Sequence, residues 1–264
     1  MNAVPLTAIC LLALSFPVSG QLPPPNAEGV STGHTHLVVP DDADARNFFR
    51  AMGAVDKSSG RLQLLEFPGM YFLLRVGEPT APSIATTANH VGFMVNDYLH
   101  YKNILLNAGA SIFFEDPETG QVLADLPWGL RVELGQDTEQ AQPIIFHHTH
   151  LSALDVESLR DWYLQVFGAE AGERRGLPSA LVPGGRVDFI PARGEAPAPT
   201  QGSAIDHIGF EVADMDAFAA KMQRMGIPFD RAPQRIDDIN LTIAFITDPA
   251  GTYIEITEGL DDVE

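Results

Sequence analysis

Residues 205–258 read IDHIGFEVADMDAFAAKMQRMGIPFDRAPQRIDDINLTIAFITDPAGTYIEITE. His207 precedes the apolar run IGFEV, which is typical of a buried strand. Asp214 is placed to cap an amphipathic helix that ends at Gly226. Two short strands follow, LTIAFIT and TYIEITE, and Glu255 lies in the middle of the second. An apolar strand does not bury a carboxylate without a partner or a metal, so the stretch combines a strand–helix–strands pattern with a histidine near its start and a carboxylate near its end.

The same pattern occurs elsewhere in the chain. HTHLVVPD at 34–41 returns as HTHLSALD at 148–155, ANHVGFMV at 88–95 as IDHIGFEV at 205–212, and PWGLRVE at 127–133 as PAGTYIE at 249–255. The spacing between the copies drifts slightly, as small loop insertions produce. The sequence therefore predicts an internal repeat.

The repeat divides the chain into two halves, 33–137 and 143–260, joined by a polar linker. Each half contains two strand–helix–strand–strand–strand units, with helices such as DADARNFFRAMGA and VESLRDWYLQVFGAE. Short strands that follow a single helix favour the α+β class with curved mixed sheets. We expect two tandem domains, each made of two βαβββ units.

The charge of the chain limits its partners. The 264 residues carry a formal net charge of −19, and 45% of them are hydrophobic. This composition is typical of a globular protein, and the charge argues against nucleic acid and anionic membrane surfaces as partners.

The first twenty residues carry no charged side chain, and residues 8–18 are almost wholly apolar. We interpret residues 1–20 as a signal peptide, too short in its apolar part to span a bilayer, which predicts a secreted or periplasmic protein. The alternative is a frayed hydrophobic N-terminus, since the segment has no Lys or Arg. The only cysteine, Cys10, lies in it, so the mature chain would contain none. Residues 21–32, rich in Pro and polar residues, are predicted to be a disordered leader.

Three residues of the motif recur in each half, and together they form a candidate metal site. The two sets are His34, His90 and Glu133, then His148, His207 and Glu255. Two imidazoles and one carboxylate leave coordination positions open, which favours a catalytic over a structural metal. A single His on an apolar strand is usually a core residue, but six of the eight histidines fall in the repeated motifs.

With these motifs the chain resembles the vicinal oxygen chelate superfamily, which includes glyoxalase I, bleomycin-resistance proteins and extradiol dioxygenases. The resemblance implies βαβββ units paired into a cupped sheet around a metal, with His148, His207 and Glu255 as ligands and, by repetition, His34, His90 and Glu133. It also implies a fourth ligand position, where Asp188 falls in the second half and Tyr71 or Phe72 in the first. The second half is therefore the favoured site. Which units pair is left open by the sequence.

Strand geometry adds candidate catalytic residues. Residues i and i+2 share a face, so His36 and His150 point to the side of His34 and His148, and Tyr253 to the side of Glu255. Either histidine could move a proton, and Tyr253 could donate a hydrogen bond to bound oxygen. The alternative for all three is packing against the sheet.

These observations predict an exported metal-dependent enzyme that chelates neighbouring oxygens of a small molecule and catalyses isomerase- or lyase-type proton transfer, using a divalent ion such as Fe, Mn, Zn or Ni. The first alternative is a non-haem Fe(II) or Mn(II) dioxygenase. The segment DDINLTIAFITDP has no His, and Phe245 stands where extradiol dioxygenases usually have Tyr. The second is a protein that sequesters a small molecule, and a third is an interaction module with a structural metal. We expect no nucleic-acid partner and no membrane after signal cleavage; a homodimer is left open.

Overall fold

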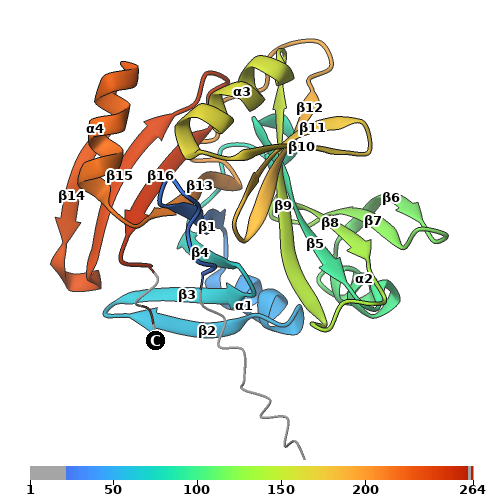
Figure 1. The fold of residues 1–264 in the computed structure, drawn as a ribbon. Helices are drawn as coiled ribbons and strands as arrows, with labels where there is room; N and C mark the ends of the chain where they lie inside the picture. Colours follow the sequence, from blue (N-terminus) through green and yellow to red (C-terminus); the bar gives the residue numbers. More distant parts are fainter. Residues whose placement is uncertain (1–21, 261–262, 264) are drawn as a thin grey trace, which may run out of the picture.

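A computed structural model describes residues 22–260 and 263, and it confirms the α+β class. Four βαβββ units follow one another along the chain (Figure 1). Unit one contains β1 (Val30–Val39), α1 (Asp42–Ala51), β2 (Val55–Ser59), β3 (Leu62–Phe67) and β4 (Met70–Val76). Unit two contains β5 (Ala88–Val95), α2 (Tyr98–Asn107), β6 (Ser111–Asp116), β7 (Gln121–Asp125) and β8 (Arg131–Gln136). The short helix η1 (Ser83–Ala85) lies between them.

The second half repeats this order. Unit three contains β9 (Ile144–Ala153), α3 (Val156–Phe167), β10 (Glu170–Arg174), β11 (Leu177–Val182) and β12 (Gly185–Pro191). Unit four contains β13 (Ile205–Val212), α4 (Met215–Met225), β14 (Arg231–Ile236), the short helix η2 (Asp237–Ile239), β15 (Leu241–Thr247) and β16 (Tyr253–Glu258).

The four α-helices of the described residues all begin in the same way. An aspartate side chain at each N-cap accepts a hydrogen bond from the backbone N–H three residues later, which satisfies one of the free donors of the first turn. Gly168 and Gly226 end α3 and α4 in the left-handed conformation, which glycine adopts without strain. The four capping residues are Asp41, Asp97, Asp155 and Asp214.

The strands form two eight-stranded sheets, and each sheet takes one unit from each half of the chain. One sheet has the order β14-β15-β16-β13-β1-β4-β3-β2, and the other has the order β10-β11-β12-β9-β5-β8-β7-β6. Unit one therefore pairs with unit four, and unit two with unit three, through the antiparallel pairs β1–β13 and β5–β9. Each sheet consists of two βαβββ units, as expected, and the pairing, which the sequence left open, joins units from different halves.

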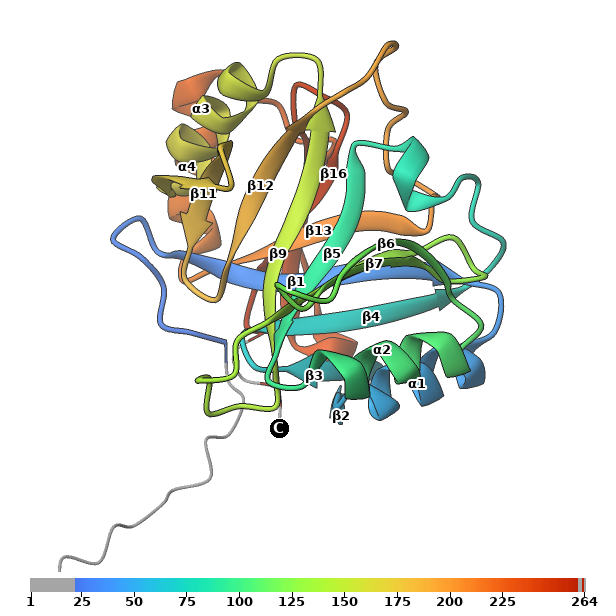
Figure 2. The same cartoon turned by 90° about the vertical axis from the view of Figure 1, so that its right-hand side faces the viewer.

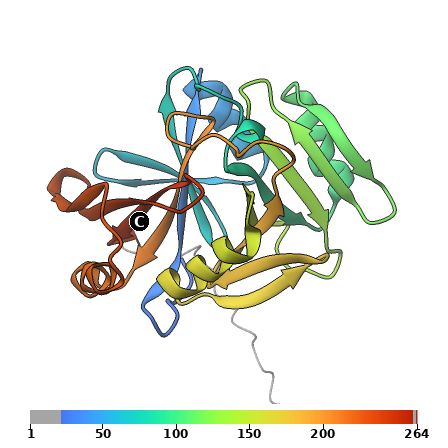
Figure 3. The same ribbon diagram turned by 90° about the horizontal axis from the view of Figure 1, so that it is seen from above.

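The two units of each half are instead joined through the hydrophobic core between the sheets. Helices α1 and α2 lie side by side, as do α3 and α4, and the strands of the two sheets cross one another (Figure 2). Phe72 stacks on Phe93 with ring centroids 5.8 Å apart, and Phe167 stacks on Phe210 at 4.0 Å. From above, units one and four lie on one side of the molecule and units two and three on the other (Figure 3). The two units of each half thus pack against each other across the core, whereas the strands pair between units of different halves.

The chain before Val30 packs against this body. Leu22 is buried, and the Asn26 side chain donates hydrogen bonds to the carbonyl groups of Phe167 and Gly168 at 2.9 and 3.1 Å. The prediction of a disordered leader over 21–32 is therefore wrong for residues 22–32, because capping contacts and apolar burial hold them. The predicted signal peptide, 1–20, lies outside the described residues. Among the described helices, none is long and apolar enough to cross a membrane.

Candidate metal centres

The histidines and glutamates of the repeated motifs meet in two buried groups, one in each sheet. His34, His207 and Glu255 form the first group, here called the His34 cluster. His90, Glu133, His148 and His150 form the second, here called the His148 cluster. Within each cluster the candidate ligand atoms lie within 4.8 Å of one another. Each cluster thus combines residues from both halves, and the expected grouping of His148 with His207 and Glu255 is wrong because β13 pairs with β1 and not with β9.

In the His34 cluster, two imidazoles converge on one carboxylate oxygen. Nε2 of His34 lies 3.0 Å, and Nε2 of His207 lies 2.8 Å, from Oε2 of Glu255. His34 comes from β1, His207 from β13 and Glu255 from β16, which are neighbours in the sheet. All three residues are buried. Two imidazole nitrogens and one carboxylate oxygen around a common point form a three-donor set that leaves positions for other ligands.

A second carboxylate orients His207 from behind. Oδ1 of Asp206 lies 2.6 Å from Nδ1 of His207, and Oδ2 of Asp206 accepts hydrogen bonds from Arg75 at 3.1 Å and from the Gly202 N–H at 2.7 Å. Burial alone would lower the pKa of His207, but the carboxylates of Asp206 and Glu255 raise it to about 9. A carboxylate at Nδ1 turns Nε2 toward the centre, an arrangement that supports metal-binding histidines.

The His148 cluster contains four donors. Nε2 of His90 lies 3.0 Å from Oε2 of Glu133, and Nε2 of His148 lies 3.3 Å from the same oxygen. Nδ1 of His150 lies 2.6 Å from Nε2 of His90. Burial alone would raise the pKa of Glu133, but the imidazoles of His148 and His90 and the Arg174 guanidinium, which lie against the carboxylate, hold it well below its ordinary value. Three imidazoles and a carboxylate fill the four positions of a tetrahedral site.

Cationic and polar side chains surround the His148 cluster further. Oε1 of Glu133 accepts hydrogen bonds from Arg174 at 2.8 Å and from Gln121 at 2.9 Å. Asp188 lies close by but outside the donor group, with Oδ1 held by Ser179 at 2.6 Å and Arg186 at 2.7 Å. Its Oδ2 lies 3.5 Å from Nε2 of His150. The geometry thus places Asp188 behind His150, and its role as a ligand stays a prediction.

The corresponding position near the His34 cluster is apolar. Asp188 pairs with His150 in the register of β12 and β9, and Leu73 pairs with His36 in the register of β4 and β1. Leu73, and not Tyr71 or Phe72, is therefore the counterpart of Asp188. The two clusters share a ligand pattern but differ in their surroundings.

Two glycines make room for the clusters. A Cβ added to Gly209 would lie 2.2 Å from the His34 ring, and one added to Gly92 would lie 1.9 Å from the His148 ring. Because no side chain can occupy this space, the glycine of HIGF and of HVGF allows the histidine of the neighbouring unit to lie flat against the strand. The motif therefore encodes the contact between units as well as a ligand.

The predicted catalytic residues lie in or beside the clusters. Nδ1 of His36 is 3.2 Å from Nε2 of His207, and burial together with that imidazole lowers the pKa of His36 to about 3. His150 is itself one of the four donors of the His148 cluster. The Tyr253 ring stacks on Phe245 with centroids 4.8 Å apart and lies edge-on to His207 at 6.0 Å.

Several residues near the clusters were missed by the sequence reasoning, namely Asn89, Gln121, Arg174, Arg186 and Asp206. The repeat itself offered a signal for two of them, because Asn89-His90 and Asp206-His207 are matching dipeptides. Arg174 and Gln121 lie on hairpins without a shared motif, and only the folded sheet brings them to Glu133.

The donor sets fit a metal ion. Among the described residues, His148 Nε2, His150 Nε2, His34 Nδ1 and Asp188 Oδ2 are buried without a hydrogen-bond partner. Buried polar atoms normally find a partner, and three of these four surround the His148 cluster. A divalent ion in the His148 cluster would supply a partner for Nε2 of His148, and an ion in either cluster would compensate its buried carboxylate. Imidazole and carboxylate donors suit Zn, Fe, Mn and Ni alike, so the ion's identity does not follow from them.

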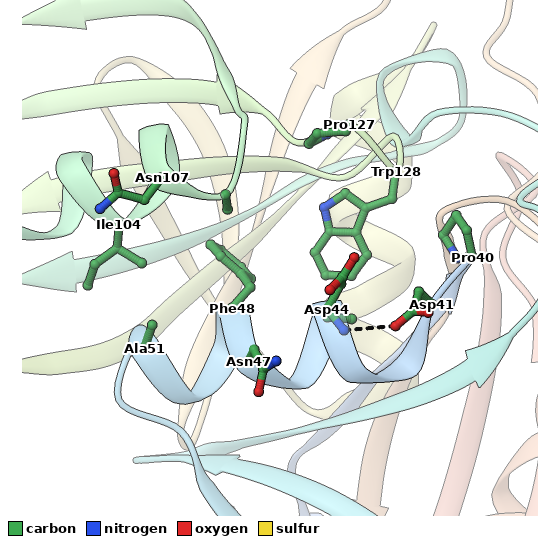
Figure 4. A pocket seen from close by; sticks show the side chains of 12 residues that line it. Pro40, Asp41, Asp44, Asn47, Phe48, Ala51, Ile104, Asn107, Pro127 and Trp128 are labelled. Carbon is green, nitrogen blue, oxygen red and sulfur yellow. Dashed lines mark hydrogen bonds between the residues drawn. The ribbon is translucent and has the colours of Figure 1, made fainter.

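A cavity of about 570 Å³ lies elsewhere, between α1 and α2. Its walls include Phe48, Asp44 and Asn47 of α1, Ile104 of α2, and Trp128 of the β7–β8 turn (Figure 4). No residue of either cluster lines it. This cavity is therefore separate from both clusters.

Comparison with known proteins agrees with this arrangement. Residues 145–256 match the family model described as Glyoxalase/Bleomycin resistance protein/Dioxygenase superfamily. Glyoxalase I from Zea mays superposes on this structure with a TM-score of 0.64 and 16% sequence identity, and the match covers 88% of this chain and 94% of that one. A point mutant of the same enzyme superposes with a TM-score of 0.66 and 15% identity, covering 89% of this chain and 95% of that one. A proposed dioxygenase from Bacillus subtilis superposes with a TM-score of 0.61 and 14% identity, and the match covers 86% of this chain and 84% of that one. At these identities the likeness concerns the fold alone. No curated protein matches the sequence.

Proposed function

We propose that the chain, of which residues 145–256 match the glyoxalase/bleomycin-resistance/dioxygenase superfamily model, is a metal-dependent enzyme whose reaction takes place at the His34 cluster. A divalent ion would bind to His34, His207 and Glu255 and hold two neighbouring oxygens of a small molecule. The reaction would be a proton transfer of the isomerase or lyase type. Export of the enzyme is part of the proposal and rests on the apolar residues 8–18.

One observation carries the proposal, the convergence of two imidazole nitrogens on one carboxylate oxygen in a buried site. The distances of 3.0 and 2.8 Å to Oε2 of Glu255 place all three donors where one ion can contact them. Three protein donors leave open positions, which is typical of catalytic sites, whereas the four donors of the His148 cluster are typical of structural ones. We therefore assign the reaction to the first cluster and a structural ion to the second.

A bound divalent ion supplies Lewis acidity, which polarises a substrate carbonyl and stabilises negative charge on its oxygen. The chain's own residues would do the rest. His36 is the imidazole of this sheet that lies next to the donors without belonging to them, so it is positioned to take a proton from the substrate and return it to a neighbouring atom. Asp206 holds His207 with Nε2 toward the centre. Phe245 and Tyr253 cover the centre and exclude water.

A second candidate function has a specific observation in its favour. Two histidines and one carboxylate also form the donor set of non-haem iron oxygenases, and in the His34 cluster Leu73 stands at the fourth position, where the other sheet has Asp188. Oxygen consumption by the iron-loaded protein with a catechol-like compound would favour this function over proton transfer.

The experiment that tests the proposal is elemental analysis of the purified protein and of a His207→Ala variant, with His100→Ala on the exposed face of α2 as the control. We expect two ions per chain in the parent and the control and one in His207→Ala, together with loss of any turnover found. No metal after reconstitution with Fe(II), Mn(II), Ni(II) and Zn(II) would overturn the proposal. In that case, tight binding of a small molecule without turnover would favour a sequestering protein.

A further inference from the structure

The cavity between α1 and α2 has a charged end and an apolar end. Asp41, Asp44 and Trp128 lie at one end, beside the start of α1, and Ile104 of α2 lies at the other (Figure 4). The Phe48 ring lies between the two ends. A volume of about 570 Å³ is within the range of cavities that take small molecules. The lining therefore suits an elongated molecule with a polar head and a hydrocarbon body.

The charge at the first end is entirely negative. Asp41 and Asp44 are exposed, and no other charged residue of the described chain lines the cavity. Asp41 caps α1 by accepting the Asp44 N–H at 2.9 Å, whereas the Asp44 carboxylate has no hydrogen-bond or ion-pair partner among the described residues. The two arginines of α1 contact Asp42 and Asp56 instead. One carboxylate is thus available to a cation that enters the cavity.

The second half of the chain contains a matching cavity that lacks this pair of acids. It lies between the start of α3 and the turn before β16, and its volume is about 340 Å³. In the repeat, Asp155 corresponds to Asp41 and Ser158 to Asp44. The Asp155 carboxylate accepts hydrogen bonds from the Ser158 N–H at 3.0 Å and from the Ser158 hydroxyl at 2.7 Å. Both oxygens of this one acid are therefore already bonded.

The aromatic residues of the two cavities differ as well. Trp128 belongs to the turn between β7 and β8, and its indole lies edge-on to Phe48 with ring centroids 5.9 Å apart. The turn before β16 has Ala250 in place of Trp128, while Trp162 stands in place of Phe48. Of the two cavities, only the first combines an unpaired carboxylate with an aromatic ring at the same end. The face of an indole attracts a cation, so the two groups favour the same class of ligand.

From this comparison we propose that the cavity between α1 and α2 binds a small organic cation, an ammonium group carried by an aromatic or alkyl body. The ammonium group would contact the Asp44 carboxylate and the Trp128 indole, and the body would extend past Phe48 toward Ile104. The net charge of −19 would further favour the approach of a cation. Because no residue of either metal cluster lines the cavity, the inference is independent of the proposed function.

The two tryptophans of the chain provide the test, since each of them lines one of the cavities. Trp162→Phe, which introduces the ring type of Phe48, leaves Trp128 as the only reporter, and Trp128→Phe leaves Trp162. Both proteins are titrated at neutral pH and low ionic strength with 4-phenylbutylamine, 4-phenylbutanol and 4-phenylbutanoate, which share a body and differ in charge. We expect a saturable change in Trp128 fluorescence, with the amine binding at least about threefold more tightly than the alcohol and the anion most weakly. We expect the Trp162 reporter to show no preference for the amine.

Variants that remove charge in the Trp162→Phe background locate the ammonium group. Asp44→Asn keeps the shape of the side chain and is expected to weaken binding of the amine by about two- to fivefold, the range of an exposed ion pair, and to leave the alcohol unchanged. Asp41→Asn/Asp44→Asn, in which asparagine can still cap α1, should remove the preference for the amine. Glu139→Gln removes one charge at an exposed position outside the cavity and is the matched control, with unchanged affinities. Circular dichroism of each variant shows whether the fold is retained.

Three results would overturn the proposal directly. They are an amine that binds no more tightly than the alcohol, the absence of any response of Trp128 to the probes, and equal affinities in Asp44→Asn and Glu139→Gln. A second copy of this chain is the competing occupant of the cavity. In that case sedimentation would show a dimer, and quenching of Trp128 by acrylamide would decrease as the protein concentration rises, which would also overturn the proposal.

Discussion

His34 and Glu255 are 221 residues apart in the sequence, and Nε2 of the first lies 3.0 Å from Oε2 of the second. The relationship between His148 and Glu133 in the other sheet is the same, with 3.3 Å between Nε2 and Oε2. Each centre therefore needs a histidine from one half of the chain and a glutamate from the other. Neither half by itself contains a complete centre.

Double variants distinguish this arrangement from one centre in each half. We expect His34→Ala/Glu255→Gln to retain one ion per chain, because both residues belong to one centre and the His148 cluster is intact. We expect His148→Ala/Glu255→Gln to retain none, because it removes a ligand from each centre. Loss of a direct ligand should lower affinity by more than the roughly 10–100-fold that follows loss of an outer partner. Elemental analysis after gel filtration gives the counts.

An arrangement with one centre in each half would give the opposite metal counts. If each half held its own centre, the two double variants would exchange their metal counts. His100→Ala serves as the control for handling losses, and circular dichroism of each variant shows whether the fold is retained.

The close approach of Gly209 to His34 leads to a second prediction. Gly209→Ala would place a Cβ 2.2 Å from the His34 ring, so the ring must move and its donor atom with it. We expect the free energy of unfolding to fall by about 1–3 kcal/mol, as overpacked sites show, and one ion per chain to be lost. Urea unfolding and elemental analysis measure the two effects.

Gly77→Ala is the matched control. A Cβ at Gly77 would meet its nearest neighbour, a Val38 methyl, at 3.5 Å, which is ordinary contact, and the backbone there needs no glycine. We expect no loss of metal from this variant. Full metal retention in Gly209→Ala would show that His34 is not held against the strand as described.

The sequence predicts the elements of this fold better than their pairing. Each helix begins beside an Asp and each unit shows the same alternation of apolar residues, so local signals are strong. The four units carry nearly the same signals, however, and any two of them could form a sheet by the same hydrogen-bond pattern. Gly92 and Gly209 indicate that another residue approaches the strand closely, but because both units carry this glycine it does not say which unit supplies that residue.

The residues of the two clusters were predictable because they repeat, and their surroundings were not. His34, His90, Glu133, His148, His207 and Glu255 all lie in the two clusters, as expected from the motif. Asp188 and Arg174 have no counterpart in the first half, where Leu73 and Ser59 occupy the matching positions, so no repeat marks them. Their contacts depend on the curvature of the sheet, which the sequence pattern does not specify.

The buried Glu66 predicts a pH dependence of stability. Burial raises its pKa in the folded state, so the native protein holds this proton more tightly than the unfolded chain does. For an acid with a raised pKa, the stabilising contribution is present below the unfolded value and is lost as the pH rises through the folded one. We expect Glu66→Gln to flatten the decline in stability between mildly acidic and neutral pH. Urea unfolding of both proteins across this range measures it, and an unchanged profile would contradict the prediction.

The Tyr163–Asp248 hydrogen bond joins α3 to the turn before β16. The Tyr163 hydroxyl donates to Oδ2 of Asp248 at 2.9 Å, and both residues are buried. Tyr163→Phe leaves that carboxylate oxygen without this donor, which costs about 1–3 kcal/mol of stability. Thermal unfolding should show the loss, whereas metal content should stay at the parent value because neither residue belongs to a cluster.

The last prediction concerns the residue before each ligand histidine. Asp206 contacts Nδ1 of His207 at 2.6 Å, and Asn89 contacts Nδ1 of His90 at 2.9 Å. A carboxylate raises the basicity of an imidazole ligand more than an amide does, so Asp206→Asn should weaken zinc binding at the His34 cluster by about 10–100-fold. The measurement requires a His148→Ala background, in which only this centre is filled, and competition with a chromogenic chelator.

The reciprocal change sharpens the test. Asn89→Asp, in a His207→Ala background, should strengthen zinc binding at the His148 cluster, because it introduces the carboxylate that the other centre has. A purely steric role for Asp206 would leave the affinity of Asp206→Asn unchanged, since Asn has the same shape, and would give no gain in Asn89→Asp. Opposite shifts in the two variants are therefore expected only if the charge behind the histidine tunes the ligand.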